Sequence, residues 1–379
     1  MKYRKFGRLD FEVSNLGFGC MRLPITDGDN GKIDEDEAIR MIRYAIDNGV
    51  NYIDTAYLYH QGNSEVLVGK ALKDGYREKV KLATKLPVWL CETAEDFDKY
   101  LNEQLKKLEV EYIDCYLLHS LGAKSWNKAK SLGVLNFLDK ALADGRIKYA
   151  GFSFHDELNI FKEIVDAYNW SFCQIQLNYM DENYQAGIEG LKYASNKGLA
   201  VIIMEPIKGG KLAKDPSGDL KDLWEKSGVN RTPAELALRW VWNHPEVTLV
   251  LSGMSTMEQV KANIETASNV TPLSLDDKEL QLIEGIKEIY SSRNRVGCTS
   301  CRYCVPCPNK VAIPDIFEIY NNYFVYELTT EGIKSYEKMK KSGIDASNCI
   351  ECGQCESACP QHLDIIQHLK EAHLVLNGN

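Results

Sequence analysis

The sequence lacks any long apolar run, and no apolar stretch follows the N-terminal segment MKYRKFGRLD. A membrane-spanning helix needs roughly 18 or more consecutive apolar residues, and a secretory signal needs an apolar region behind its basic start. We therefore expect a cytoplasmic protein without a membrane span. Basic residues are also outnumbered, because 45 Lys and Arg face 54 Asp and Glu and leave a net charge of −9. This acidic balance repels phosphate groups, so we expect neither a dedicated nucleic-acid-binding role nor binding to an anionic membrane.

The remaining composition is that of a globular protein, with 44% hydrophobic and 26% charged residues in a chain of 379 residues. That length is comfortable for two domains. Twelve cysteines are present, and eight of them lie between Cys298 and Cys359. The other four are scattered through the first part of the chain. A disulfide scaffold is typical of short exported chains, so the dense cluster indicates a metal site.

Eight short apolar runs alternate with amphipathic segments over residues 1–288. Such nearly continuous apolar runs are typical of parallel strands buried on both faces. The runs begin at Leu16, Asn51, Val80, Tyr112, Ile147, Cys173, Leu199 and Val247. Eight strand–helix repeats predict a (β/α)₈ barrel, of the TIM-barrel kind, with a small hairpin ahead of it, and a doubly wound sheet is the alternative.

A second domain is predicted over residues 289–379. The polar segment 288–297 interrupts the alternation and ends in glycine, as a linker would. Cysteine motifs follow it, separated by a mainly helical stretch from 313 to 341. The second domain is therefore expected to be small and mainly helical.

Four ionisable side chains fall at the ends of three successive predicted strands, where barrel enzymes carry their reactive groups. They are Asp54 with Tyr59 in the loop behind it, Lys85, and His119. Asp54 and Lys85 stand in apolar runs, where an unpaired charge is costly, so we expect an ion pair. A lysine ammonium stabilises the phenolate form of Tyr59 and so makes its phenol a better acid. The phenol could then donate its proton to a carbonyl oxygen that His119 orients. The alternatives are a structural ion pair, a surface tyrosine and a hydrogen-bonded rim histidine.

The segments NYIDTAYLYH, LATKLP and YLLHS resemble those around the Asp, Tyr, Lys and His tetrad of the aldo-keto reductase superfamily. The resemblance covers roughly the first 285 residues. It implies Tyr59 as the general acid, Lys85 and Asp54 as its tuning pair, and His119 as the residue that orients the substrate. It also implies a nicotinamide cofactor bound without a Rossmann loop, and no G-x-G-x-x-G motif lies between the first strand and helix.

The same resemblance assigns residues to the cofactor. Ser153 and Gln174 match positions that bind the carboxamide, and Met204 falls where many members stack a tyrosine on the nicotinamide ring. Phe154 stands where the family commonly has an Asn that also binds the carboxamide.

The segment SGMSTMEQVKAN (252–263) follows the eighth strand and leads into a helix whose N–H groups suit a phosphate. The alternative is a plain capping box between Ser255 and Glu258. NADPH-preferring members often carry Lys and Arg where this chain has Gly253 and Gln259, so NADPH and NADH both stay open. The cofactor contacts expected in this segment are Ser252, Gly253, Ser255, Gln259 and Asn263.

The clustered cysteines form two runs. The first has the spacing CxxCxxCxxCP and the second the spacing CxxCxxCxxxCP. The second run is the bacterial ferredoxin signature, in which the cysteine before proline binds the other cluster. Zinc is the alternative, although structural zinc usually takes two separated CxxC pairs. The runs are Cys298, Cys301, Cys304 and Cys307, then Cys349, Cys352, Cys355 and Cys359.

This module resembles the two-cluster ferredoxin domain found at the C-terminus of one branch of aldo-keto reductases. The resemblance implies two 4Fe-4S clusters, and a single cluster on the second run is the alternative. The implied ligands are Cys298, Cys301, Cys304 and Cys359 for the first cluster, and Cys349, Cys352, Cys355 and Cys307 for the second.

The combined prediction is an NADPH- or NADH-dependent oxidoreductase that acts on a small-molecule carbonyl or alcohol and carries an iron–sulfur domain. The competing hypothesis is a redox or oxygen sensor, or an electron-transfer protein, whose barrel binds nucleotide while the clusters carry the function. Hydride transfer needs no cluster, and no flavin motif is present to convert between one and two electrons. The clusters are therefore either structural or pass electrons to a separate partner.

Overall fold

The computed structural model describes residues 1–298, 300 and 302–378. They form two compact units, of which the first comprises residues 1–215 and 230–279. The second comprises residues 216–229 and the chain from residue 280 onward. Within the described residues, no helix has the length and apolar character that a membrane crossing requires.

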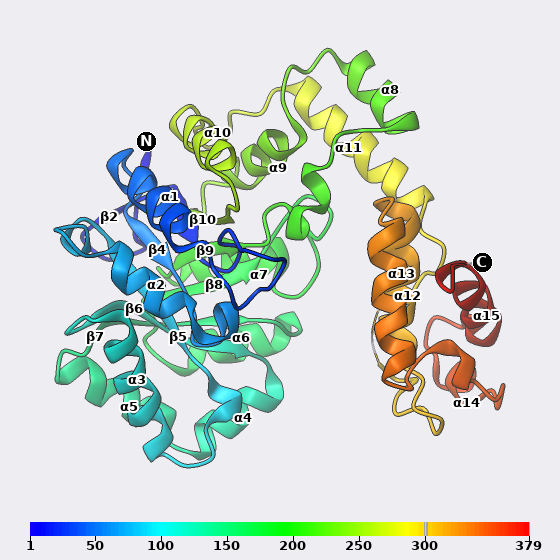
Figure 1. Ribbon diagram of the computed structural model, residues 1–379, viewed down its shortest axis with the longest axis horizontal. Coiled ribbons are helices and arrows are strands. Elements are labelled where there is room, and N and C mark those ends of the chain that lie inside the picture. The colour runs from blue at the N-terminus through cyan, green and yellow to red at the C-terminus, as the bar shows by residue number, and fades with distance from the viewer. Residues whose placement is uncertain (299, 301, 379) are drawn as a thin grey trace. The chain divides into compact units, whose positions relative to one another are not determined.

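Eight parallel strands close into a barrel in the first unit (Figure 1). Each strand pairs with the next one in the chain, and the last closes on the first, with Val250 opposite Leu16. The predicted (β/α)₈ barrel is therefore confirmed, and the doubly wound alternative is wrong. The strands are β3 (Leu16–Gly19), β4 (Tyr52–Asp54), β5 (Lys81–Leu86), β6 (Ile113–Leu121), β7 (Ile147–Phe154), β8 (Phe172–Gln176), β9 (Ala200–Met204) and β10 (Val247–Gly253).

Some helices of this unit begin at a side chain that caps their first turn. Asp34 accepts the backbone N–H of Glu37 at the start of the first helix, and Thr232 accepts that of Glu235. Each cap satisfies an N–H group that the helix leaves without a partner. The helices are α1 (Glu35–Asp47), α2 (Ser64–Ala71), α3 (Glu95–Leu108), α4 (Ala123–Ser131), α5 (Val134–Ala143), α6 (Leu158–Ala167), α7 (Gly187–Asn196), α9 (Pro233–Trp242) and α10 (Met257–Ser268).

A hairpin of β1 (Tyr3–Lys5) and β2 (Glu12–Ser14) precedes the barrel, as predicted. Phe6, which follows β1, is fully buried. Its ring packs against Tyr52 and Phe172, with ring centroids 6.3 and 5.6 Å away. Tyr52 and Phe172 are the first residues of their strands, so the hairpin closes the N-terminal end of the barrel. The opposite end, at the C-terminal ends of the strands, is the one at which barrels of this kind carry their functional sites.

The second unit is mainly helical. Helices α12 (Ile313–Val325) and α13 (Thr329–Lys341) lie side by side and confirm the helical stretch predicted between the cysteine runs (Figure 1). Their buried side chains share a core with α15 (Ile365–Leu376), centred on Phe317, Tyr336 and Leu369. This unit also contains α8 (Gly218–Ser227), α14 (Gln354–Ala358) and, from residue 280 onward, α11 (Asp277–Ser292).

The predicted linker at 288–297 is wrong over half of its length, because α11 continues to Ser292. Ile283, Ile286 and Tyr290 are buried, and their spacing places them on one face of the helix. Beyond the helix, Val296 is also buried, and its N–H donates to Asn321 Oδ1 at 2.9 Å. Most residues of the segment are polar and most of these are exposed, so its composition indicated a linker although one face of the helix is apolar and buried.

Candidate functional site

A cavity of about 490 Å³ lies at the C-terminal ends of the barrel strands. Parallel strands end at the same rim, so residues distant in sequence meet there. All eight residues assigned to the cofactor line the cavity, together with three of the four assigned to catalysis. The former are Ser153, Gln174, Met204, Ser252, Gly253, Ser255, Gln259 and Asn263, and the latter are Asp54, Tyr59 and His119.

Lys85 lies behind this wall, fully buried. Its Nζ is 2.6 Å from Asp54 Oδ1, 2.8 Å from the Thr55 carbonyl oxygen and 3.3 Å from Tyr59 Oη. These three acceptors match the three protons of an ammonium group. Burial alone would lower the pKa of Lys85, but the nearby Asp54 and Tyr59 raise it above its ordinary value. Lys85 is therefore a permanent cation beneath the tyrosine.

Tyr59 projects from a distorted turn, η1 (Tyr59–Gly62), directly after β4. Burial raises the pKa of Tyr59, Lys85 lowers it and Asp54 raises it, and the net shift is upward. Lys85 thus acts in the predicted direction, but burial outweighs it. The phenol is consequently protonated at neutral pH, so it can serve as a proton donor.

His119, from β6, faces the tyrosine with its ring nearly perpendicular to the Tyr59 ring, and the centroids are 6.1 Å apart. The Trp89 ring lies on another side, 5.0 Å away. Burial lowers the pKa of His119 well below its ordinary value, and Lys85 and His155 lower it further. Its Nδ1 is buried and has no hydrogen-bond partner among the described residues. A neutral imidazole with one donor and one acceptor suits the orientation of a carbonyl oxygen.

The segment after β10 is capped differently from the prediction. Helix α10 begins at Met257, and its cap is Thr256, whose Oγ1 accepts the N–H of Gln259 at 3.3 Å. Gln259 Oε1 in return accepts the N–H of Ser255 at 2.8 Å. The predicted capping box between Ser255 and Glu258 is therefore wrong by one residue. Because the helix starts one residue later, the Ser255 hydroxyl is free to donate to the Arg22 carbonyl oxygen, 2.7 Å away.

Sequence reasoning missed Met21 and Arg22, which follow β3 directly and line the cavity. Arg22 is the one Lys or Arg side chain on the cavity wall in the part of the chain that the structure describes. Its stem lies against Gly253, because a Cβ atom placed there would come within 2.8 Å of Arg22 Cγ. Their position directly behind the first strand was the signal that could have identified them.

His155 was also missed. Side chains alternate along β7, so Ser153 and His155 both face the cavity while Phe154 points the other way. Phe154 is fully buried, with its ring centroid 5.1 Å from that of Phe161. The residue that stands where Asn is common therefore packs beneath α6, and His155 takes a place on the cavity wall.

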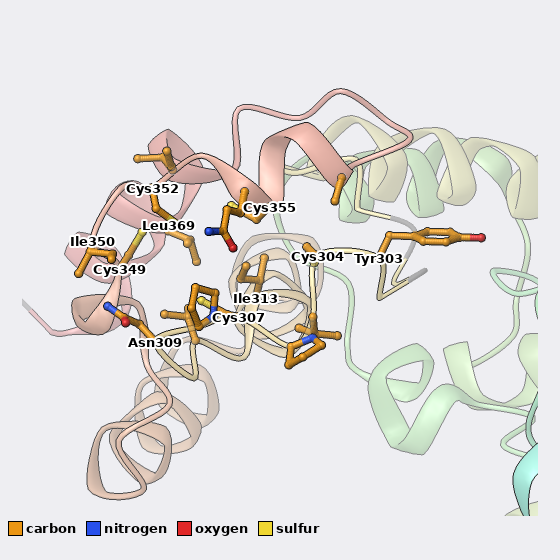
Figure 2. Close-up of a pocket in the computed structure, with 17 residues that line it drawn as sticks. Tyr303, Cys304, Cys307, Asn309, Ile313, Cys349, Ile350, Cys352, Cys355 and Leu369 are labelled. Atoms are coloured by element: carbon orange, nitrogen blue, oxygen red, sulfur yellow. The ribbon is translucent and has the colours of Figure 1, made fainter.

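In the second unit, the cysteines gather around two cavities. The larger, about 240 Å³, is lined by five cysteines, all labelled in Figure 2: Cys304, Cys307, Cys349, Cys352 and Cys355. The smaller is lined by Cys298, Cys304 and Cys359. Cys301 lies outside the described residues. Cys307 therefore lies with cysteines of the second run, and Cys359 lies with cysteines of the first. In the ferredoxin arrangement, the cysteine before proline binds the cluster of the other run in this way.

Comparison with known families matches both parts of the chain. The model of the aldo/keto reductase family matches residues 15–288. The model of the 4Fe-4S dicluster domain matches residues 297–363.

Individual relatives match the barrel part. The probable aldo-keto reductase 1 of Glycine max is 28% identical over 313 residues, which span 74% of this chain and 87% of the relative. The L-galactose dehydrogenase of Arabidopsis thaliana is 27% identical, over 76% of this chain and 95% of the relative. Among solved structures, the holo form of aldo-keto reductase AKR11C1 from Bacillus halodurans is 31% identical, with a TM-score of 0.62. That match covers 75% of this chain and 96% of the other.

Proposed function

Because this chain belongs to the aldo/keto reductase family of oxidoreductases, we propose that it uses a nicotinamide cofactor to reduce the carbonyl group of a small molecule, or to run the reverse oxidation. Family membership alone does not identify a reaction, which must be argued from the site. The observation that carries the proposal is the contact of 3.3 Å between Tyr59 Oη and Lys85 Nζ at the edge of the cavity.

The cavity wall fits a nicotinamide carboxamide. Gln174 Oε1 is buried and finds no hydrogen-bond partner within the described chain, so it can accept an amide N–H. Ser153 Oγ accepts the backbone N–H of Ser120 at 2.7 Å, which leaves its own proton to donate. Met204 lies beside Gln174, with its sulfur 3.5 Å from Gln174 Nε2, and can cover one face of an aromatic ring. When bound, the nicotinamide supplies or accepts the hydride.

The chain's own residues handle the proton. Tyr59 donates its phenolic proton to the substrate oxygen as that oxygen gains negative charge. The ammonium group of Lys85 stabilises the phenolate that remains, and Asp54 holds the ammonium in place. His119 donates its N–H to the same substrate oxygen and so fixes the direction of the carbonyl. In the oxidation direction, the Tyr59 phenolate takes up the proton of the alcohol.

Replacement of Tyr59 by Phe tests the proposal. General acid catalysis contributes about a hundredfold to ten-thousandfold to a rate, so kcat should fall by at least about a hundredfold. Binding of NADPH or NADH, followed by fluorescence titration, should persist because the variant loses only a hydroxyl group. The matched control is Tyr57→Phe, since the Tyr57 hydroxyl donates to Glu103 at 2.8 Å and Tyr57 does not line the cavity.

Two results would count against the proposal. Turnover by the Tyr59→Phe variant at the wild-type rate would remove Tyr59 from the mechanism. A wild-type protein that binds nucleotide but reduces none of a broad panel of aldehydes and ketones would favour the sensor hypothesis instead.

We also propose that the second unit holds two 4Fe-4S clusters, with the ligand sets implied by the ferredoxin spacing. The match to the dicluster domain and the gathering of seven described cysteines around two cavities support this proposal. When bound, such clusters carry single electrons, which the hydride reaction does not require. An electron-transfer partner would then exchange electrons with this unit.

Anaerobic purification followed by iron and sulfide analysis tests the cluster proposal. Two clusters require about eight iron atoms per chain, four for each. Cys352→Ser should lower that number by about four, because it removes a ligand of one cluster only. Cys173→Ser is the control, since Cys173 is buried in the barrel strand β8. A colourless protein containing zinc would contradict the proposal.

A further inference from the structure

The residue after Tyr59 is a histidine whose ring is engaged on both sides. His60 is buried, with 2% of its surface exposed, and it does not line the cavity. Its Nδ1 lies 2.8 Å from the carbonyl oxygen of Asn30, and its Nε2 lies 3.2 Å from the backbone nitrogen of Leu23. A carbonyl oxygen can only accept and a backbone N–H can only donate. The ring is therefore neutral, with its proton on Nδ1.

Both partners belong to one stretch of chain, residues 20–31, which we call the β3–α1 segment. The two residues that follow the turn of Tyr59 hold this segment at further points. Asn63 Nδ2 donates to the Gly31 carbonyl oxygen at 2.8 Å, and Ser64 Oγ donates to the Cys20 carbonyl oxygen at 3.1 Å. The bonds of His60 fall between these two anchors. The whole segment is thereby attached to the turn after β4.

Within the segment, Met21 and Arg22 form part of the cavity wall, immediately before Leu23. The bond from the Leu23 N–H to His60 therefore sets the backbone next to both side chains. The Ser255 hydroxyl holds the other side of Arg22 through its carbonyl oxygen. Of these two attachments, only the one to His60 depends on a titratable group.

The turn adopts an unfavourable backbone to make these contacts. His60 and Gln61 have φ angles of +51° and +56°, in the left-handed region that residues other than glycine rarely adopt. Such strain persists only where the surrounding contacts over-determine it. Here the two ring contacts of His60 are those contacts.

We propose that His60 is a positioning residue, which holds the β3–α1 segment and hence Met21 and Arg22 in place for cofactor binding only while its imidazole is neutral. The proposal rests on the proposed function, because it takes the cavity to be the cofactor site. Protonation would put a hydrogen on Nε2, directly opposite the Leu23 N–H. Two donors would then face each other, and the bond would be lost.

The pH at which this occurs follows from the surroundings of the ring. Burial lowers the pKa of His60 below 6.5, the Asn30 carbonyl oxygen raises it, and the charge of Arg22 lowers it. Arg22 is the charged side chain that acts on the ring, and its two direct partners are backbone groups. The folded protein thus binds a proton at His60 less readily than the unfolded chain does. The attachment is present above pH 6.5 and is lost as the pH falls through the lower folded value.

The test uses the full chain, purified anaerobically, with the variants His60→Gln and His60→Ala. Loss of one buried hydrogen bond next to a binding wall should weaken NADPH or NADH binding by about tenfold or more. We expect the KM for cofactor to rise more than kcat falls, because Tyr59 and Lys85 are untouched. Hydrogen exchange of the β3–α1 segment should become faster in both variants.

The pH dependence separates this role from a general effect on folding. Wild-type affinity for the cofactor should fall as the pH is lowered below 6.5, whereas His60→Gln should lack that fall because glutamine does not titrate. His244→Gln is the matched control: burial also lowers the pKa of His244, but that residue lies off the cavity wall. Its affinity and pH profile should be those of the wild type.

Several outcomes would overturn the proposal. One is wild-type cofactor affinity in His60→Gln and His60→Ala together with unchanged exchange of the segment. Another is a two-bond ¹H–¹⁵N spectrum of the wild-type protein with the proton of His60 on Nε2, a readout that needs no variant to fold. A wild-type protein that binds neither nucleotide defeats the proposed function, while the exchange rates and the spectrum still decide whether His60 holds the segment.

Discussion

Removal of the buried cation beneath the tyrosine should separate the stability of the site from its catalysis. In Lys85→Met, the side chain keeps most of its apolar volume but loses the ammonium group that contacts Asp54 at 2.6 Å and Tyr59 at 3.3 Å. Asp54 is then left buried without its partner. Breaking one side of a buried ion pair costs about 3–5 kcal/mol of folding stability. The barrel should therefore unfold at a markedly lower denaturant concentration.

The double variant Asp54→Asn/Lys85→Met removes both charges. Its stability should recover to within about 1–3 kcal/mol of the wild type, because what remains is chiefly the unsatisfied carbonyl oxygen of Thr55. Its activity should not recover. Lys85 is the group that lowers the pKa of Tyr59 against the effect of burial, and neither variant contains it.

The assays are denaturant unfolding under anaerobic conditions and the absorbance of NADPH or NADH during turnover. Loss of positioned proton transfer predicts a fall in kcat of about a hundredfold or more in both variants. Wild-type turnover by the double variant would refute the role of Lys85. If Lys85→Met were as stable as the wild type, Lys85 would not compensate the buried charge of Asp54.

Three further predictions concern the titration of Tyr59 and the close contacts of two glycines. Because burial raises the pKa of Tyr59 above its ordinary value, the rate of reduction should show no fall from its titration between pH 6 and 8. The rate of alcohol oxidation should rise with pH, and a rate that falls above pH 8 would contradict the assignment. Gly7→Ala should destabilise the barrel by about 2–5 kcal/mol in denaturant unfolding, through overpacking and the φ of +57°, since the new Cβ would lie 2.5 Å from the Ala200 nitrogen. Gly253→Ala should displace the flexible Arg22 side chain, because the new Cβ would come within 2.8 Å of it. Cofactor affinity should then change severalfold without a comparable loss of stability. A cofactor affinity equal to that of the wild type would exclude Arg22 from the binding wall.

Much of the fold was predictable because its strands and helices follow from local patterns of apolar and polar residues. Each barrel strand is a short apolar run, and the residue at its end is known once the run is located. That is why Asp54, Lys85 and His119 could be named before any distance was known. The linker was mispredicted because Tyr290, a buried apolar residue in a mostly polar segment, continues the helical spacing of Ile283 and Ile286, which precede the segment.

The parts of the site that escaped prediction depend on loops. Arg22 lies in the loop beyond β3, where no periodicity indicates which way a side chain points. His155 lies one residue beyond β7, so its direction follows from the alternation only once the bounds of that strand are known. The contacts of His60 with Leu23 and Asn30 join residues about thirty positions or more apart. Only the folded chain brings such groups together.

The sequence by itself determined the kinds of chemistry present: three reactive groups at strand ends, a tyrosine in the loop behind one of them, and two cysteine runs with ferredoxin spacing. These are properties of residue type and local spacing, which hold before the chain folds. Tertiary structure decided which of those groups lie close together and how burial and neighbouring charges shift their pKa values. It set Tyr59 as a protonated phenol, since burial outweighs Lys85, and it brought Cys307 to the second cysteine run. Burial and distance between remote residues arise only when the barrel closes and the helices pack, so no local pattern could contain them.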